Sequence, residues 1–343
     1  MSTRIPATVA VSRPNLVGFL VVLALVMAIA LLLPVVANRG LVFIAGILLI
    51  NAIYGMGFNL LFSTVGILSF GQAAFFAAGA YTAAMLMLQL GSMPYALVLL
   101  SAGLMGAFLA FLIGILALRR TVGVYFAILT LAFGELLQIV LSKNNYTGRN
   151  DGLPGIRRPT IELGPYTLDL SSGDDFYYLI VVVCALLFAL LWWISHSHLG
   201  RRFQSVRQDD MRAAFLGINV FRTRLLGLVL AGGITGVAGG LYAPWTQIVT
   251  PELAQWSNSA YPILFTLLGG AAFFWGPLVG AVVFAGIDYA LRAQVGATDL
   301  VTGLLLLGVV LAMPGGVLGL LSGLRARVAV IFGGQSGRDE ASR

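Results

Sequence analysis

The sequence predicts an all-α protein, a polytopic membrane helix bundle, on three observations. Hydrophobic residues make up 59% of the chain and charged residues only 10%, whereas soluble domains carry about 25% charged residues. Apolar runs recur that are long enough to cross the hydrocarbon core, roughly 30 Å thick, as helices. Most arginines lie in the short segments between these runs. So few charges cannot cover a water-facing surface, but they suffice where the surface faces lipid.

The apolar runs predict about ten membrane spans. They cover residues 16–37, 41–62, 69–90, 94–118, 122–142, 176–195, 224–243, 259–275, 277–292 and 299–321. The eighth and ninth form one stretch of about 33 residues, too long for one upright helix and short for two. Gly276 and Pro277 lie near its middle, and proline removes a backbone donor and clashes with the preceding turn. A helix break at these residues favours two short helices over one kinked helix.

The distribution of arginine predicts the orientation, because Lys and Arg accumulate in cytoplasmic loops. An N-inside arrangement places Arg119, Arg120 and the basic loop at 196–223 inside. Both termini are then inside, which requires an even number of spans. This predicts a cytoplasmic N-terminal tail, a transmembrane domain and a cytoplasmic C-terminal tail, at residues 1–15, 16–321 and 322–343. The same bias explains the net charge of +7 without a nucleic-acid partner.

The sequence lacks the residue patterns of a nucleotide-binding site, an enzyme active site and a metal site. A phosphate-binding P-loop needs G-x-x-x-x-G-K-[ST], but the single lysine, Lys143, follows Ser142. We therefore expect no cofactor here, so that ATP, if it drives the protein, is bound by a partner. We find no nucleophile–base set that would indicate an enzyme. His196 and His198 are two residues apart and cannot face one way on a helix, so we expect no metal site.

The basic loop at 196–223 is the most informative polar segment. Asp209 is a suitable N-cap, since its carboxylate can accept backbone N–H bonds of a first turn. Gly217 is a natural C′ residue, and a short helix containing Ala213 and Ala214 is expected between them. Such a helix is marginal alone. Two interpretations stay open: the helix docks against another protein, or the loop lies on anionic headgroups.

This loop resembles a known family of transporters. Its pattern G-R-x-x-x-x-V-R-x-D-x-x-x-A-x-x-x-G-I-N, from Gly200 to Asn219, is similar to the cytoplasmic loop of LivM-type permeases of branched-chain amino acid ABC transporters. Further segments that resemble this family are 66–82, 125–135, 147–155, Gly269-Gly270 and Trp275-Gly-Pro277. The chain departs from the family at Arg149, Ala272 and Phe273, where glycine or small hydroxyl residues are usual. These departures bear on the substrate rather than on the fold.

The resemblance implies an importer subunit in the bacterial inner membrane. Such permeases pair as two membrane subunits, bind two cytoplasmic ABC ATPase subunits and receive substrate from a periplasmic or lipid-anchored binding protein. The inside helix would be the coupling helix that contacts the ATPase. The residues implied in coupling are Arg207, Asp209, Asp210, Met211, Ala213, Ala214, Gly217, Ile218 and Asn219. The substrate would be a branched-chain or other hydrophobic amino acid, with urea, amides or aromatic acids as alternatives.

Residues inside the predicted spans are candidates for the translocation path. Intramembrane ionisable groups are costly and usually functional, which singles out Glu135. It faces the pore or bridges helices, or else it lies near the outer interface or pairs with another subunit. The other candidates are Gln72, Phe75, Phe76 and Tyr81, for which helix–helix hydrogen bonding or lipid contact are the alternatives. Asp288 precedes Arg292 by four residues, which favours an ion pair on one helix.

An ion-coupled secondary transporter is the competing class. It would carry coupling groups near the midplane, such as a carboxylate pair or an unwound sodium site. Within the predicted spans only Glu135 suggests such a group. The docking loop and the family resemblance therefore favour the ABC importer.

Overall fold

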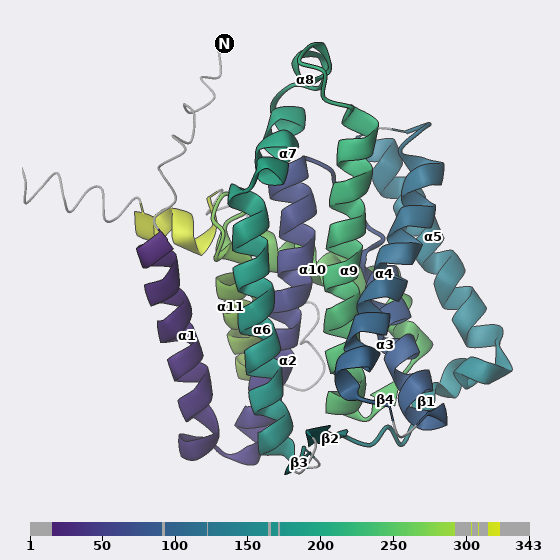
Figure 1. Cartoon of the computed structure of the whole chain (residues 1–343), viewed down its shortest axis with the longest axis vertical. Coiled ribbons are helices and arrows are strands. Elements are labelled where there is room, and N and C mark those ends of the chain that lie inside the picture. Colours follow the sequence, from purple (N-terminus) through teal and green to yellow (C-terminus); the bar gives the residue numbers. More distant parts are fainter. Residues whose placement is uncertain are drawn as a thin grey trace, which may run out of the picture.

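The computed structural model describes residues 16–90, 93–121, 123–163, 166–170, 172–291, 303, 308 and 315–322. Its longer helices are α1 (Leu16–Val36), α2 (Arg39–Asn59), α3 (Gln72–Gln89), α4 (Tyr95–Ala117), α5 (Val124–Lys143), α6 (Gly173–His196) and α9 (Val220–Thr246). The shorter helices are α7 (His198–Gln208), α8 (Asp210–Phe215), α10 (Trp256–Gly269) and α11 (Gly276–Leu291). The long helices stand side by side, with α8 projecting beyond one end of the bundle (Figure 1).

The other end carries short strands and turns, and we call it the strand end (Figure 1). Among the described residues, β1 (Leu153–Pro154) pairs antiparallel with β4 (Ile248–Val249), and β2 (Thr160–Leu163) pairs antiparallel with β3 (Tyr166–Asp169). Three 3-10 helices lie in the same connections: η2 (Asn145–Thr147), η3 (Arg149–Asp151) and η4 (Pro251–Ala254). The β1–β4 pair ties the segment after α5 to the segment after α9.

Six described helices are long and apolar enough to cross a membrane: α1, α2 with its extension to Val65, α4, α5, α6 and α9. The predicted third, eighth and ninth spans correspond to α3, α10 and α11, of 18, 14 and 16 residues. At 1.5 Å per residue α11 reaches about 24 Å, short of the hydrocarbon core. The predicted span 299–321 and Arg292 lie largely or wholly outside the described residues, so the total of ten stays a prediction.

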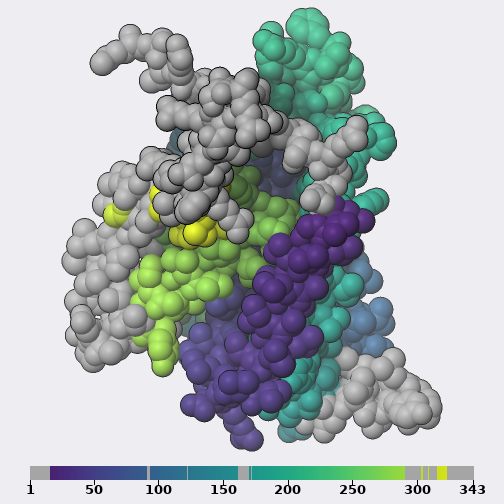
Figure 2. Space-filling view, turned by 90° about the vertical axis from the view of Figure 1, so that its left-hand side faces the viewer, coloured from purple at the N-terminus to yellow at the C-terminus, as the bar shows by residue number. Residues whose placement is uncertain are grey.

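Burial separates the helices at the centre of the bundle from those at its surface. The most apolar windows of α2 and α9 are each 61% buried, whereas that of α1 is 11% buried. Figure 2 shows α1 crossing the surface of the molecule as an outer layer. Its exposed leucine and valine side chains match a lipid environment, as expected for a helix that faces hydrocarbon.

Glycines bring the backbones of α3, α4 and α9 into contact. A Cβ at Gly79 of α3 would lie 2.1 Å from the Gly236 oxygen of α9. A Cβ at Gly106 of α4 would lie 2.4 Å from the Gly232 oxygen. Neither position has room for a side chain, which is how small residues allow close helix packing in lipid. We call these three helices the glycine-packed core.

The break predicted between the second and third spans, at residues 63–68, lies at residues 66–71. After α2 the chain forms a π-helix, η1 (Leu60–Val65). The helical conformation ends at Gly66, whose φ of 83° favours glycine. Residues 67–71 are non-helical, so α3 begins three residues later than predicted. Phe70 N donates to Thr130 Oγ1 at 3.1 Å and Ala73 N to Ser259 Oγ at 3.0 Å. Non-helical backbone is tolerated at membrane depth when protein groups satisfy it in this way.

The predicted stretch 259–292 contains two helices rather than one kinked helix. The helical conformation ends at Gly269, residues 270–275 form turns, and α11 begins at Gly276. The break therefore lies before the predicted residues, Gly276 and Pro277, which start the second helix. Proline is well suited to a first helical turn, because its missing N–H would have no partner there. We call α10 and α11 with their connection the α10–α11 hairpin.

Candidate functional site

The helix predicted in the basic loop is present as α8 and is capped at both ends. The Asp209 carboxylate accepts hydrogen bonds from Met211 N at 3.0 Å and Arg212 N at 3.1 Å. At the other end Gly217 has a φ of 81°. Gly217 N donates to Ala214 O and Ile218 N to Ala213 O, both at 3.0 Å. This pair of bonds is a Schellman motif, so the loop sequence itself specifies where α8 starts and stops.

The tip of this loop presents apolar side chains to its surroundings. Met211, Phe215 and Leu216 are 71%, 87% and 78% exposed. The tip projects beyond the ends of the neighbouring helices (Figures 1 and 2). Ala213 is buried and faces the rest of the loop. We call Met211, Phe215 and Leu216 the apolar tip.

Contacts on both sides hold α8 in place. Asp210 forms a 2.6 Å ion pair with Arg224 of α9. The Asn219 side chain caps α9 by accepting from Arg222 N at 2.9 Å. On the other side α7 buries Phe203 and packs against η1. The predicted coupling residues are thus divided between capping α8, anchoring it and forming its exposed surface.

A chain of hydrogen bonds leads from the basic loop to the α10–α11 hairpin. Arg207 of α7 donates from Nη1 to the carbonyl oxygen of Ser63 in η1. The Ser63 hydroxyl lies 2.6 Å from the Ala271 carbonyl, inside the hairpin connection, and 2.5 Å from Asn59 Oδ1. Its single proton serves one of these acceptors at a time. Ser63 therefore touches both the loop and the hairpin.

Four of the residues predicted to line a translocation path lie on α3, and the fifth, Glu135, lies on α5. Gln72, Phe75 and Tyr81 are buried within the bundle, and Gln72 Oε1 accepts from Thr235 Oγ1 of α9 at 3.0 Å. Glu135 of α5 accepts from the backbone N–H of Trp256 at 2.8 Å. Trp256 is the first residue of α10. Glu135 thus bridges α5 and α10 rather than lining the cavity described next.

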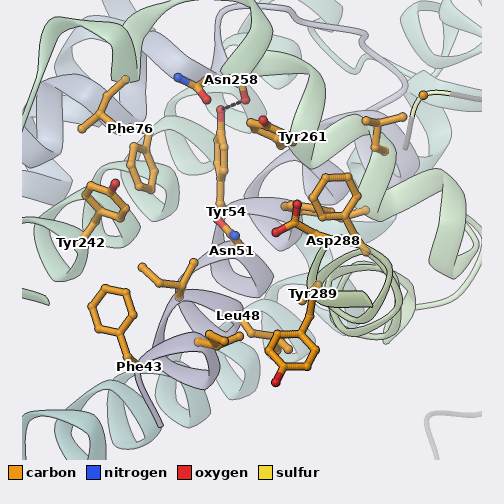
Figure 3. A pocket seen from close by; sticks show the side chains of 18 residues that line it. Phe43, Leu48, Asn51, Tyr54, Phe76, Tyr242, Asn258, Tyr261, Asp288 and Tyr289 are labelled. Carbon is orange, nitrogen blue, oxygen red and sulfur yellow. Dashed lines mark hydrogen bonds between the residues drawn. The ribbon is translucent and has the colours of Figure 1, made fainter. Parts of the chain in front are cut away.

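A cavity of about 700 Å³ lies between α2, α9, α10 and α11 (Figure 3), within the usual range for ligand pockets, roughly 300–1,000 Å³. The lining residues are Phe43, Ile44, Ile47, Leu48, Asn51, Tyr54, Phe76, Tyr242, Leu253, Asn258, Tyr261, Leu264, Phe265, Phe284, Ala285, Asp288, Tyr289 and Gly303. The residues from α2 run from Phe43, near its start, to Tyr54, past its middle, and Tyr242 lies in the last part of α9. The cavity therefore extends from the strand end to about the middle of the bundle.

Of the predicted path residues only Phe76 lines this cavity. Sequence reasoning missed the others because they come from helices that meet only in the folded chain. Asn51 and Tyr54 lie one helical turn apart on α2, and this spacing of two polar side chains in an apolar span is the one local pattern that could have indicated the cavity. For Asp288 the sequence predicts an ion pair with Arg292, which lies outside the described residues.

Among the described residues no three His, Cys, Asp or Glu side chains gather as metal ligands. His196 Nδ1 is 2.8 Å from the Trp192 carbonyl, while His198 Nδ1 is 2.9 Å from Arg201 Nη2. The Nδ1 atoms of the two histidines contact different groups, so in the structure they are not arranged to bind one metal ion together.

Comparisons with known proteins agree with the membrane fold. The family described as "Branched-chain amino acid transport system / permease component" matches residues 40–313. The LivM permease protein of Escherichia coli K12 is 32% identical over 77% of this chain and 66% of its own length. LivM of Salmonella typhimurium is 30% identical over 75% of this chain and 65% of its own length. The chain thus spans just under two thirds of these relatives.

A second kind of relative has a lower sequence identity, but this chain matches more of its length. The LivH permease protein of Salmonella typhimurium is 23% identical over 78% of this chain and 91% of its own length. No solved structure matches the chain significantly. The relatives are transport permeases, and such proteins are not enzymes. On the extent of the family match and the identity to LivM, this multi-pass membrane protein belongs to the permease family of branched-chain amino acid transport systems.

Proposed function

We propose that the chain is the permease subunit of an ATP-binding-cassette importer for branched-chain or other hydrophobic amino acids. The observation that carries this proposal is the apolar tip, formed by Met211, Phe215 and Leu216 on a projecting helix. A six-residue helix gains little stability by itself, yet this one is capped at both ends. Exposed apolar groups held on a preformed helix suit a groove on a partner protein.

The proposed partners are those that the resemblance to ABC importer permeases implies. The single lysine of the chain, Lys143, is not in a P-loop, so we assign ATP binding to two cytoplasmic ATPase subunits, which would receive α8. A second permease subunit completes the translocation path, and a periplasmic or lipid-anchored protein delivers the substrate. The names of the relatives support two different permeases, since LivM and LivH are both permease proteins of a high-affinity branched-chain amino acid transport system.

The same proposal assigns the two ends of the bundle. Arg201, Arg202, Arg207, Arg212 and Arg222 are in the basic loop, which places the α8 end in the cytoplasm by the positive-inside rule. The strand end and the cavity then belong to the periplasmic half of a protein in the bacterial inner membrane. Both termini are cytoplasmic, and α10, α11 and the segment 299–321 complete about ten membrane segments.

The contacts around Ser63 suggest how the ATPase acts on the path. When the ATPase subunits close on ATP, they displace α8. Arg207 passes this displacement to Ser63, and the Ser63 hydroxyl reaches the Ala271 carbonyl of the α10–α11 hairpin. The hairpin lines the cavity, so its movement would alter access to the path. The glycine-packed core provides the fixed part against which it moves.

The experiment is to replace Phe215 by Asp and to measure co-purification with the cognate ATPase. Because Phe215 is exposed, the substitution should leave the fold of the permease unchanged. A central aromatic contact is worth about 2 kcal/mol or more, so we expect ATPase affinity to fall by roughly 30-fold.

Tyr146→Asp is the matched control, since Tyr146 is 80% exposed in η2 at the strand end. This variant should bind the ATPase like the wild type. If Phe215→Asp retained wild-type ATPase binding, docking through the apolar tip would be wrong.

A further inference from the structure

Aromatic side chains of α1, α6 and the connection of the α10–α11 hairpin pack together as one group. Phe19 of α1 is stacked with Trp192 of α6 at 4.8 Å and with Trp275 of the connection at 5.5 Å, measured between ring centroids. Phe274, also in the connection, meets Phe19 edge-on at 5.7 Å. Offset-stacked and edge-on pairs are the arrangements that aromatic rings prefer. We call Phe19, Trp192, Phe274 and Trp275 the aromatic clasp.

Phe19 fixes the start of a helix that is otherwise mostly exposed. The most apolar window of α1 is 11% buried, and the buried residues of this helix are Phe19, Met27 and Ala30. Phe19 is 6% exposed, whereas Val17 and Leu20 beside it are 69% and 49% exposed. A phenylalanine that needed only an apolar environment could face lipid as these neighbours do, because lipid tails are as apolar as leucine. Its burial among three rings is therefore a specific contact between α1, α6 and the hairpin connection.

The same group of rings reaches the basic loop. Trp192 packs against His196 with ring centroids 4.4 Å apart, and His196 is the last residue of α6. The next residue, Ser197, caps α7 by accepting a hydrogen bond from Leu199 N at 3.2 Å. Figure 1 shows the start of α1 near the end of α6, towards the side of the bundle that carries α7 and α8. A displacement of α7 and α8 would therefore reach Trp192, and through it Phe19.

The aromatic clasp and Ser63 hold the hairpin connection at different places and by different means. The Ser63 hydroxyl lies 2.6 Å from the Ala271 carbonyl, whereas Phe19 contacts Phe274 and Trp275, directly before α11 begins. A hydrogen bond weakens steeply with distance and angle, while aromatic pairs remain favourable over a range of separations and offsets. The connection is thus held by a directional contact from η1 and by an adjustable contact from α1.

We propose that Phe19 is a positioning residue for transport, through which α1 holds the hairpin connection against α6 and links it to the basic loop. This assignment rests on the proposed function, because it adds a second connection between the helix that receives the ATPase and the hairpin. It gives α1, the least buried of the six described membrane-length helices, a role in coupling as well as in lipid contact. Loss of the ring should leave ATPase docking intact and weaken the movement that is passed to the hairpin.

The test replaces Phe19 by Leu in the complete transporter, reconstituted in proteoliposomes with its ATPases and binding protein. Leucine is apolar and a good helix former, but it removes the ring. We expect uptake of L-leucine per ATP hydrolysed to fall roughly fivefold, the order of effect of one lost aromatic pair. Co-purification with the ATPase should be unchanged. Phe19→Tyr keeps the ring and should retain most of the uptake.

Met27→Ala is the matched control for packing. Met27 is also buried on α1, but it lies about 12 Å further along the helix at 1.5 Å per residue. This variant should lower the melting temperature at least as much as Phe19→Leu does, because it removes more buried apolar volume. Its uptake per ATP should stay at the wild-type value.

A double variant tests whether the aromatic clasp acts separately from the Ser63 contact. Free-energy effects of independent sites add, so their effects on uptake multiply. Because Phe19→Leu and Ser63→Ala are each expected to lower uptake per ATP roughly fivefold, the double variant should lie about 25-fold below the wild type.

Three results would overturn the assignment. Wild-type uptake per ATP in Phe19→Leu would reduce the aromatic clasp to packing. An equal loss of uptake per ATP in Met27→Ala would show that uptake follows the stability of α1. A double variant no worse than Ser63→Ala alone would show that Phe19 adds no second connection. Wild-type complexes that import no amino acid would instead contradict the proposed function itself, so the two failures are distinguishable.

Discussion

The glycine-packed core and the α10–α11 hairpin are both built from apolar helices that meet at glycines, but they differ in what surrounds them. In the core, backbones of α3, α4 and α9 meet with no room for a Cβ at Gly79 or Gly106. The hairpin also has a close contact of this kind, since a Cβ at Gly280 would overlap the Phe265 oxygen. It stands beside a cavity of about 700 Å³, and its connection contacts η1 through Ser63. Close-packed interiors resist gradual deformation. A part that moves therefore needs space on one side and a defined contact on the other, and the hairpin has both.

This difference predicts that substitutions in the core change stability, and that those in the hairpin or the basic loop change coupling. The largest expected effect is that of Gly79→Leu. Its Cβ alone would lie 2.1 Å from the Gly236 oxygen, so the backbones of α3 and α9 must separate. We expect a loss of about 3 kcal/mol or more, measured as a much lower melting temperature in detergent.

Gly286→Leu supplies the control for this prediction. Gly286 is also a helix glycine, but an added Cβ there would meet nothing within 4 Å. Its melting temperature should stay close to that of the wild type. Equal melting temperatures for the two leucine variants would show that the core is not packed as tightly as described.

The next effect concerns the end of α8. Gly217 has a φ of 81° with open space around its Cβ position, so Gly217→Val introduces backbone strain without a clash. The left-handed conformation costs about 1–2 kcal/mol for most residues, enough to deform the Schellman motif. We expect the melting temperature to hold while substrate-stimulated ATP hydrolysis and uptake fall roughly tenfold.

Asparagine tolerates the left-handed conformation, so Gly217→Asn should retain most of the activity. Normal substrate-stimulated ATP hydrolysis by Gly217→Val would contradict the role of α8 in coupling.

A smaller effect is expected at the contact between η1 and the hairpin. Ser63→Ala removes the hydroxyl near Ala271 but keeps the carbonyl that accepts from Arg207. A lost hydrogen bond is worth about 1 kcal/mol, so we expect uptake per ATP to fall roughly fivefold at unchanged ATPase binding. Ser63→Thr should restore it, because the hydroxyl returns.

Ser101→Ala is the matched control for Ser63, since the Ser101 hydroxyl bonds only within its own helix, to Val98 O at 2.7 Å. If both alanine variants lowered uptake equally, Ser63 would have no specific role in transmission.

Features that depend on residues close together in the sequence could be predicted, and features that depend on residues far apart in the sequence could not. The long apolar runs predicted the six described helices that are long and apolar enough to cross a membrane. Asp209 and Gly217 predicted α8, because caps act within a few residues. The break between the second and third predicted spans was expected at residues 63–68 and lies at residues 66–71, because the apolar Ile67 and Leu68 do not specify where the helical conformation ends. Hydrophobic periodicity does not report a loss of helical conformation in a segment that stays buried.

The cavity and the role of Glu135 depended on distant segments. Tyr54, Tyr242 and Phe284 lie on three helices far apart in the sequence, and no spacing relates them. Glu135 was a reasonable path candidate because an intramembrane carboxylate is costly. Its partner is a backbone N–H at the start of α10, and a backbone group has no sequence signature.

The smallest effect follows from that contact. Gln255, at the N-cap of α10, makes no side-chain cap bond, and the Glu135 carboxylate supplies an acceptor from another helix instead. Removing a cap typically costs about 1 kcal/mol, so Glu135→Ala should lower the melting temperature by a few degrees and leave coupling intact. Glu135→Gln keeps an oxygen and should lose less than half of this, since only the charge–dipole part disappears. If Glu135→Gln instead stopped uptake at normal stability, Glu135 would belong to the translocation path, and the fixed region would extend no further than the glycine-packed core.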